Sequence, residues 1–135
     1  MSGAEYGRQL PPFTVNLIVR DVERSVAFYR EVLEATIRYS DPDFAALRLT
    51  ELDVMLHADH TYEDHPWHPR LASEEPRGLG AELRLFRVNP DEVEARARTN
   101  GAMVVQPTTD KSHGWREVMV ADPDGYLWAV GVPTP

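Results

Sequence analysis

The stretch TVNLIVRDVERSVAFYREVLE at residues 14–34 decides the fold, because it joins an alternating strand to an amphipathic helix. Over residues 13–19 every second side chain is apolar, which predicts a half-buried strand. Asp21 is a good N-cap residue, and the apolar residues after it recur at helical spacings, which predicts a helix over 22–33. That helix can cover the strand with one stripe, which consists of Val22, Val26, Tyr29 and Leu33.

A weaker copy of this plan lies at residues 82–101, where ELRLFRV precedes a helix predicted over 90–99. Pro90 suits the first turn of that helix, and Gly101 suits its end. Each helix is followed by short strand-like runs and turns, such as DPDG at 122–125. The predicted strands are 13–19, 35–39, 45–49 and 53–57, then 82–88, 103–106, 116–121 and 126–132. The sequence therefore predicts an α+β fold of two tandem βαβββ modules, 12–58 and 80–132, joined by a linker at 59–79 within a single domain, 1–135.

Length, composition and charge limit the possible functions. A chain of 135 residues without cysteine makes one domain and excludes disulfides, thiolate metal sites and a cysteine nucleophile. No apolar run reaches the roughly 20 residues that span a bilayer, and residues 1–12 lack a signal-peptide core. The net charge of −8 repels nucleic acid and anionic membranes and mildly favours cationic ligands. We expect a cytoplasmic protein with no nucleic-acid or membrane partner.

Four histidines begin at the end of the first module and continue into the linker, with the spacing H-x2-H-x4-H-x2-H: His57, His60, His65 and His68. One interpretation is a metal site built from the linker. The other is a solvated loop, which the acidic residues and the three prolines of this segment favour. Metal ligands need neighbouring groups that fix their orientation, and nothing in the loop sequence indicates such groups.

Two strings resemble the signatures of a known family. VRDVERSVAFYREVLE at 19–34 and DPDGYLW at 122–128 are similar to those of the vicinal oxygen chelate superfamily. That superfamily includes glyoxalase I, extradiol dioxygenases, fosfomycin-modifying enzymes and bleomycin-binding resistance proteins. The resemblance extends over about 13–132 and implies the glyoxalase/bleomycin-resistance fold, in which paired βαβββ modules form a cup of curled sheets, usually within a homodimer. It implies the fold more specifically than the activity.

The resemblance also implies where metal ligands would lie. The equivalent positions here are Thr14, His57 (or Leu56 after a shift of one residue), Glu82 and Ala129. Only His57 and Glu82 can bind a divalent ion, and a catalytic site normally needs three protein ligands. We therefore expect no metal cofactor. If a divalent metal is bound, His57 and Glu82 are its ligands; otherwise His57 bonds to a neighbour and Glu82 lines the cup.

The strand alternation predicts which side chains face a ligand. The wall of the cup consists of Thr14, Asn16, Met55, His57, Glu82, Arg84 and Phe86, with Trp115 and Tyr126 near the rim. Trp128 fits either the cavity or the core. Aromatic faces, a methionine and a few polar groups suit a planar or amphipathic molecule. Trp115 either covers the mouth of the cavity or packs across a dimer.

Other chemistries have little support in the sequence. There is no nucleophile elbow, P-loop or dinucleotide motif, and His57 with Glu82 is the one candidate acid–base pair. Asp122 and Asp124 are interpreted as turn formers. We therefore predict no catalytic residues and a homodimeric small-molecule binding protein of the bleomycin-resistance type, which sequesters an aromatic or cationic compound. The alternatives are a divalent-metal-dependent lyase, isomerase or dioxygenase, and an accessory domain without a ligand.

Overall fold

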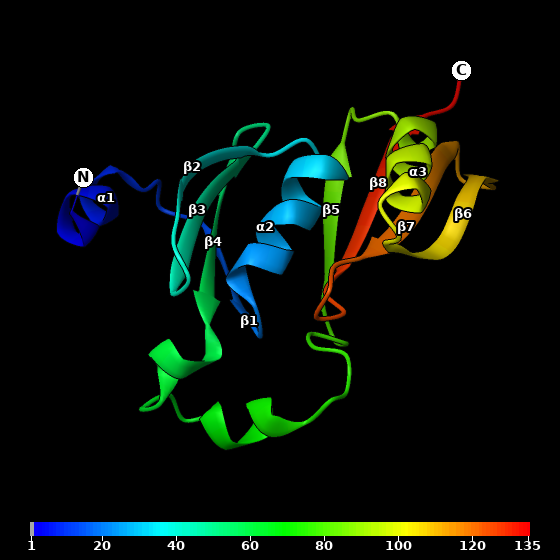
Figure 1. Ribbon diagram of the computed structural model, residues 1–135. Coiled ribbons are helices and arrows are strands. Elements are labelled where there is room, and N and C mark those ends of the chain that lie inside the picture. The colour runs from blue at the N-terminus through cyan, green and yellow to red at the C-terminus, as the bar shows by residue number, and fades with distance from the viewer. Residues whose placement is uncertain (1) are drawn as a thin grey trace.

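The computed structural model describes residues 2–135 and contains two similar α/β modules, each a four-stranded sheet with a helix (Figure 1). Module one consists of β1 (Val15–Val19), α2 (Val22–Glu31), β2 (Thr36–Ser40), β3 (Phe44–Leu49) and β4 (Leu52–Ala58). Module two consists of β5 (Glu82–Phe86), α3 (Pro90–Thr99), β6 (Met103–Lys111), β7 (Trp115–Ala121) and β8 (Leu127–Pro133). The strand orders, β1-β4-β3-β2 and β5-β8-β7-β6, are equivalent, and neither sheet closes on itself. The predicted α+β fold of tandem βαβββ modules is confirmed.

The first helix packs as its apolar spacing predicts. Asp21 caps α2 by accepting a hydrogen bond from the backbone N–H of Arg24. The predicted stripe of Val22, Val26, Tyr29 and Leu33 is buried, and it belongs to the same core as Leu17 and Val19 of β1. Each such side chain contributes about 1.5–3 kcal/mol through burial, so this face fixes the register of the first sheet.

The start of the first strand differs from the prediction. The alternation predicts Phe13 on the buried face of the strand, but 74% of the surface of Phe13 is exposed. The first residue of β1 to pair is Val15, opposite Val54 of β4. Pro11 and Pro12 stand immediately before Phe13 and restrict the backbone there, so the strand begins two residues later. Strand β6 is longer than predicted, because it continues through irregular pairing with β7 as far as Lys111.

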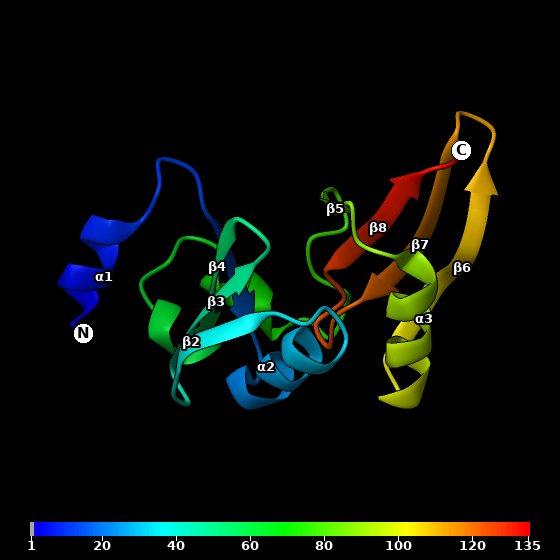
Figure 2. The ribbon, with the colours of Figure 1, turned by 90° about the horizontal axis from the view of Figure 1, so that it is seen from above.

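Three short helices have no counterpart among the predicted elements. These are α1 (Gly3–Gln9) and two 3₁₀ helices in the linker, η1 (Asp59–Tyr62) and η2 (His68–Ala72). Helix α1 begins with a capping box between Ser2 and Glu5, a pattern that is visible in the sequence. It lies across the first sheet from α2 (Figure 2). No helix within residues 2–135 is long and apolar enough to cross a membrane.

Most residues of the linker are exposed, and a buried arginine holds the linker to module one. Arg77 is buried, and its guanidinium donates to both carboxylate oxygens of Asp59 at 2.6 and 2.7 Å. The same group donates to the backbone carbonyls of Ile18 and Leu71. One side chain thus joins both ends of the linker to the end of β1.

The DPDG turn contributes more than a local bend. Asp122 accepts hydrogen bonds from the backbone N–H groups of Asp124 and Tyr126, as expected of a turn former. Its other carboxylate oxygen accepts a 2.6 Å hydrogen bond from the hydroxyl of Tyr29 in module one. Asp124 accepts from the backbone N–H and the guanidinium of Arg20. These buried carboxylates therefore also join the two modules, which a reading of local turn residues could not show.

Candidate functional site

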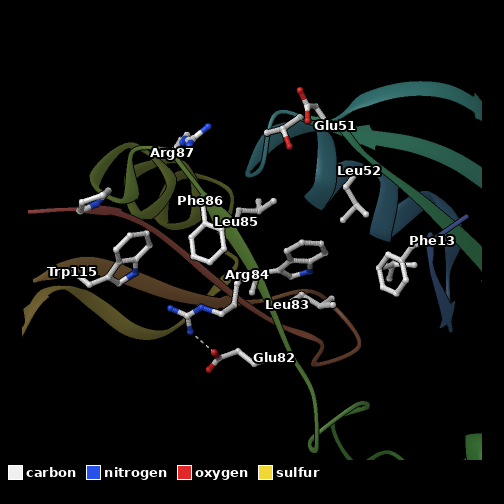
Figure 3. Close-up of a pocket in the computed structure, with 14 residues that line it drawn as sticks. Phe13, Glu51, Leu52, Glu82, Leu83, Arg84, Leu85, Phe86, Arg87 and Trp115 are labelled. Carbon is white, nitrogen blue, oxygen red and sulfur yellow. Dashed lines mark hydrogen bonds and ion pairs between the residues drawn. The ribbon is translucent and has the colours of Figure 1, made fainter. Parts of the chain in front are cut away.

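The outward face of β5 carries a polar and aromatic set. Glu82, Arg84 and Phe86 alternate with Leu83 and Leu85, so the first three face away from the core. They border a cavity of about 970 Å³ between β5 and module one, here called the groove. Its other main residues are Trp115 of β7 and, from module one, Phe13 and Leu52 (Figure 3).

The polar part of the groove is a charged network. The guanidinium of Arg84 donates to Glu82 and also to Glu117, the latter at 3.1 Å. These hydrogen bonds, first that to Glu82, raise the pKa of Arg84. Glu117 is only 3% exposed, and its Oε1 has no hydrogen-bond partner within residues 2–135. Two carboxylates with one guanidinium give this network a formal charge of −1, which favours a cationic or hydrogen-bond-donating ligand group.

The aromatic part of the groove is a pair of rings. Phe86 and Trp115 meet edge to face with their centroids 5.4 Å apart. The indole lies close to the backbone at Gly131, where an added Cβ would come within 2.6 Å of Nε1. Any side chain at position 131 would therefore collide with the Trp115 ring and with the backbone of β7. The pair presents apolar ring surface to the groove beside the charged network.

A second set of residues lies on module one, on the sheet face away from α2. The Nδ1 of His57 is 2.6 Å from Oδ1 of Asn16, and Nδ2 of Asn16 donates to the hydroxyl of Tyr62 at 2.7 Å. This chain of bonds assigns the proton to Nδ1 and leaves the lone pair on Nε2. Burial lowers the pKa of His57, which favours the neutral form of its ring.

Aromatic rings surround this histidine. Phe44 lies 4.8 Å from His57 and Tyr62 lies 5.1 Å from it, centroid to centroid. We call Asn16, Phe44, His57 and Tyr62 the histidine face. Met55 is opposite Asn16 in the β1–β4 register and is half-buried, so it belongs to the same region.

The predicted site residues thus fall into two groups in one chain. Glu82, Arg84, Phe86, Trp115 and Trp128 border the groove, while Asn16, Met55 and His57 lie on module one. Glu82 borders the groove and His57 does not, and no hydrogen bond joins these two residues of the candidate acid–base pair within residues 2–135.

Three predicted site residues use their polar side-chain atoms in hydrogen bonds within the fold, so these atoms are not free to bind a ligand. Trp128 is completely buried and its indole N–H donates to the hydroxyl of Tyr29, so it belongs to the core beneath the groove. The hydroxyl of Tyr126 donates to the carbonyl of Ile18, and its ring lies near Gly78 of the linker. Thr14 donates through Oγ1 to the carbonyl of Asp53. All three positions follow from tertiary contacts that alternation along a strand does not reveal.

Other residues of the site were missed. Glu117 is a charged residue two positions after Trp115, so strand alternation places both on one face, and this signal was available. Tyr62 lies in the linker, where no periodic pattern relates it to His57. Phe13 and Leu52 reach the groove from the other module, a contact that only the tertiary structure determines.

At three of the positions where the resemblance implies metal ligands, the side chain has another partner or no donor atom within this chain. The hydroxyl of Thr14 is already used, Glu82 is paired with Arg84, and Ala129 has no donor atom. Arg84 is the register neighbour of Ala129, so a guanidinium rather than a ligand occupies this part of the sheet. Within residues 2–135, no three His, Asp or Glu side chains gather closely enough to hold a metal ion, and the linker histidines are no exception.

Comparison with known proteins identifies the family. Residues 12–130 match the model described as the Glyoxalase/Bleomycin resistance protein/Dioxygenase superfamily. The chain belongs to this superfamily. It is also 32% identical over 132 residues to uncharacterized proteins of Mycobacterium bovis and Mycobacterium tuberculosis. These matches cover 91% of this chain and 84% and 75% of those proteins.

Solved structures with the same fold include those of two named proteins. The fosfomycin resistance protein FosX of Listeria monocytogenes superposes with a TM-score of 0.69 at 19% identity, covering 93% of this chain and 94% of that one. TioX of Micromonospora sp. ML1 superposes with a TM-score of 0.67 at 22% identity, covering 92% and 99%. At such identities the likeness shows the shared fold alone.

Proposed function

We propose that this glyoxalase-superfamily protein binds a planar organic compound, aromatic or cationic, and sequesters it without transforming it. The groove carries the proposal, because it combines the Phe86–Trp115 ring pair with a carboxylate-rich network beside it. A cavity with apolar walls and a few convergent polar groups is the usual form of a small-molecule site. The description of FosX as a fosfomycin resistance protein makes antibiotics a sensible class to test.

The expected binding free energy comes from two parts of the groove. A ring stacked on Trp115 gains about 0.5–1.5 kcal/mol beyond simple burial. A cationic group that donates to Glu82, which borders the groove, gains about 1.5–3 kcal/mol per charge-assisted hydrogen bond. Since 1.4 kcal/mol corresponds to one decade of affinity, either contact changes the dissociation constant by about tenfold.

The proposal includes a second copy of the chain. The histidine face and the groove are separate in one chain, and each carries only part of a ligand-binding wall. Strands β1 and β5 are at the edges of their sheets, with one side unpaired. In a homodimer, module one of one chain would face module two of the other, so that His57 and Glu82 of different chains share a cup.

The test is a thermal-shift screen of aromatic and cationic antibiotics, followed by calorimetric titration of the compounds that stabilise the protein. We expect Trp115→Ala and Glu82→Gln each to weaken binding about tenfold. Trp67→Ala, which changes an exposed ring on the linker, is the matched control and should leave affinity unchanged. Added chelator should also have no effect.

Two results would contradict this proposal. If chelator abolishes binding, or if divalent ions give the protein a lyase, isomerase or dioxygenase activity, the metal-dependent alternative is correct. If both groove variants retain full affinity for every stabilising compound, the ligand does not bind in the groove.

A further inference from the structure

A second cavity lies between α1 and the first sheet, separate from the groove. Its volume is about 380 Å³, which is within the range of small-molecule sites. We call it the tyrosine cleft; its main residues are Tyr6 of α1, Arg38 and Tyr39 of β2, Asp41, and Phe44 of β3. None of these residues borders the groove.

Three aromatic rings form the apolar part of the tyrosine cleft. Phe44 contacts Tyr6 edge to face, with centroids 5.9 Å apart and an interplanar angle of 71°. The ring of Tyr39 lies 6.2 Å from Phe44 at 34°. Tyr39 is 52% exposed, which leaves much of its ring surface uncovered by the protein. A flat ring inserted here would contact aromatic surface from both α1 and the sheet.

Some polar atoms of the cleft have hydrogen-bond partners and others do not. The hydroxyl of Tyr39 is used, because it donates to Asp41 at 2.5 Å. The hydroxyl oxygen of Tyr6 is buried and has no hydrogen-bond partner within residues 2–135. Arg38 makes one long contact, 3.4 Å, to Asp53, and its guanidinium has further donors. A phenolic O–H and a guanidinium therefore remain available to an oxygen acceptor.

Helix α1 is only loosely attached to the sheet. It has seven residues, none of them buried, and it is too short to be stable alone in water. No side chain or backbone lies within 4 Å of a Cβ built at Gly3 or Gly7, so these parts of the helix face open space. Its aromatic contact with the sheet is the one between Tyr6 and Phe44. A ligand in the cleft would add contact area to a helix that has little, and would hold it in place.

We propose that the tyrosine cleft is a subsite for a planar aromatic group bearing an oxygen acceptor, such as an aryl carboxylate, and that α1 closes over it. The inference rests on the proposed function, because Phe44 also contacts His57 and so extends the histidine face into the cleft. One end of the ligand would then be an aromatic ring with an oxygen acceptor, and Tyr6 and Arg38 would recognise that acceptor.

The test uses naphthalene-2-carboxylate as the probe and the full chain labelled with ¹⁵N. We expect amide shifts to concentrate in residues 3–9, 38–41 and 44–46, and hydrogen exchange of α1 to slow when the probe binds. Tyr6→Ala should weaken binding at least tenfold, and Tyr6→Phe, which keeps the ring but removes the hydroxyl, several-fold. Tyr39→Ala is a second variant on the sheet side of the cleft, and it should also weaken binding.

Trp115→Ala is the control that separates this inference from the proposed function. The inference holds if the shifts persist in Trp115→Ala and are lost in Tyr6→Ala. It is overturned if millimolar probe gives no shifts in the cleft, if the shifts lie only at residues 82–86, or if the Tyr6 and Tyr39 variants bind normally. The proposed function fails on different evidence, namely groove variants that retain affinity for the compounds that stabilise the protein.

Discussion

Asp122 is a carboxyl group placed almost entirely inside the molecule, at the junction of the two modules. Its partners are the Tyr29 hydroxyl and the backbone N–H groups of Asp124 and Tyr126. Burial outweighs these hydrogen bonds and raises the pKa of Asp122 to about 6. The native state therefore binds a proton more tightly at this group than the unfolded state does, so the group destabilises the fold when it is ionised.

The free energy of unfolding therefore falls as the pH rises through the pKa of Asp122. Well below pH 4 Asp122 is protonated in both states, and its burial does not lower the free energy of unfolding. As the pH rises past 6 the ionised carboxylate lowers the free energy of unfolding by about 3 kcal/mol, because the pKa is raised from 3.8 to about 6 and one pKa unit corresponds to about 1.36 kcal/mol. We compare wild type with Asp122→Asn, which carries no charge. The free energy of unfolding of wild type relative to the variant should rise by about 1 kcal/mol between pH 6 and pH 5. Urea unfolding at both pH values measures this, and a difference independent of pH would contradict it.

Among the elements, the linker is held in place by the buried Arg77. Arg77 is 8% exposed and holds Asp59 at one end of the linker and Leu71 near the middle. Removing one partner of a buried ion pair leaves the other charge unpaired and typically costs about 3–5 kcal/mol. Arg77→Ala should therefore lower the free energy of unfolding by about 3 kcal/mol, since Asp59 is partly exposed, and limited proteolysis should cut residues 59–79 faster.

Arg70 provides the matched control for this element. It is an exposed linker arginine that stacks on the exposed ring of Trp67 with its guanidinium carbon 4.7 Å from the ring centroid. Such an exposed contact is worth about 0.5–1 kcal/mol, so Arg70→Ala should have a small effect. Equal proteolysis of both variants would show that Arg77 does not anchor the linker.

Periodicity explains which elements could be predicted from the sequence. The helix at 90–99 and the stripe of α2 follow from spacing and caps alone, and their positions are confirmed. Arg77 has no local signal, because its partners lie far along the chain or are backbone carbonyls. Helix α1 had a readable capping box, but seven residues without an apolar stripe give no packing signal. The sequence indicated Glu82, Arg84, Phe86 and Trp115 of the groove and Asn16 and His57 of the histidine face. It did not indicate Glu117 or Tyr62, nor that the two groups lie apart in one chain.

At the scale of the whole molecule, two exposed aromatic rings lie where the two modules meet. Phe13 is 74% exposed and Phe86 is 58% exposed, and both border the groove. The unpaired edges of β1 and β5 lie in the same region (Figures 1 and 3). Exposed apolar surface and open sheet edges together are typical of an interface between chains. A second copy related by twofold symmetry would cover both at once.

We therefore expect a homodimer at micromolar concentration, measured by sedimentation velocity. Phe13→Glu should weaken the dimer by at least tenfold, because burying this ring is worth about 1.5–3 kcal/mol and an unpaired carboxylate cannot replace it. Trp67→Glu makes the same chemical change at another exposed ring, outside the groove, and should leave the dimer intact. A wild-type monomer at micromolar concentration would contradict the shared cup. If Phe13→Glu and Trp67→Glu behaved alike, the dimer would form through another surface, and His57 and Glu82 of different chains would not meet.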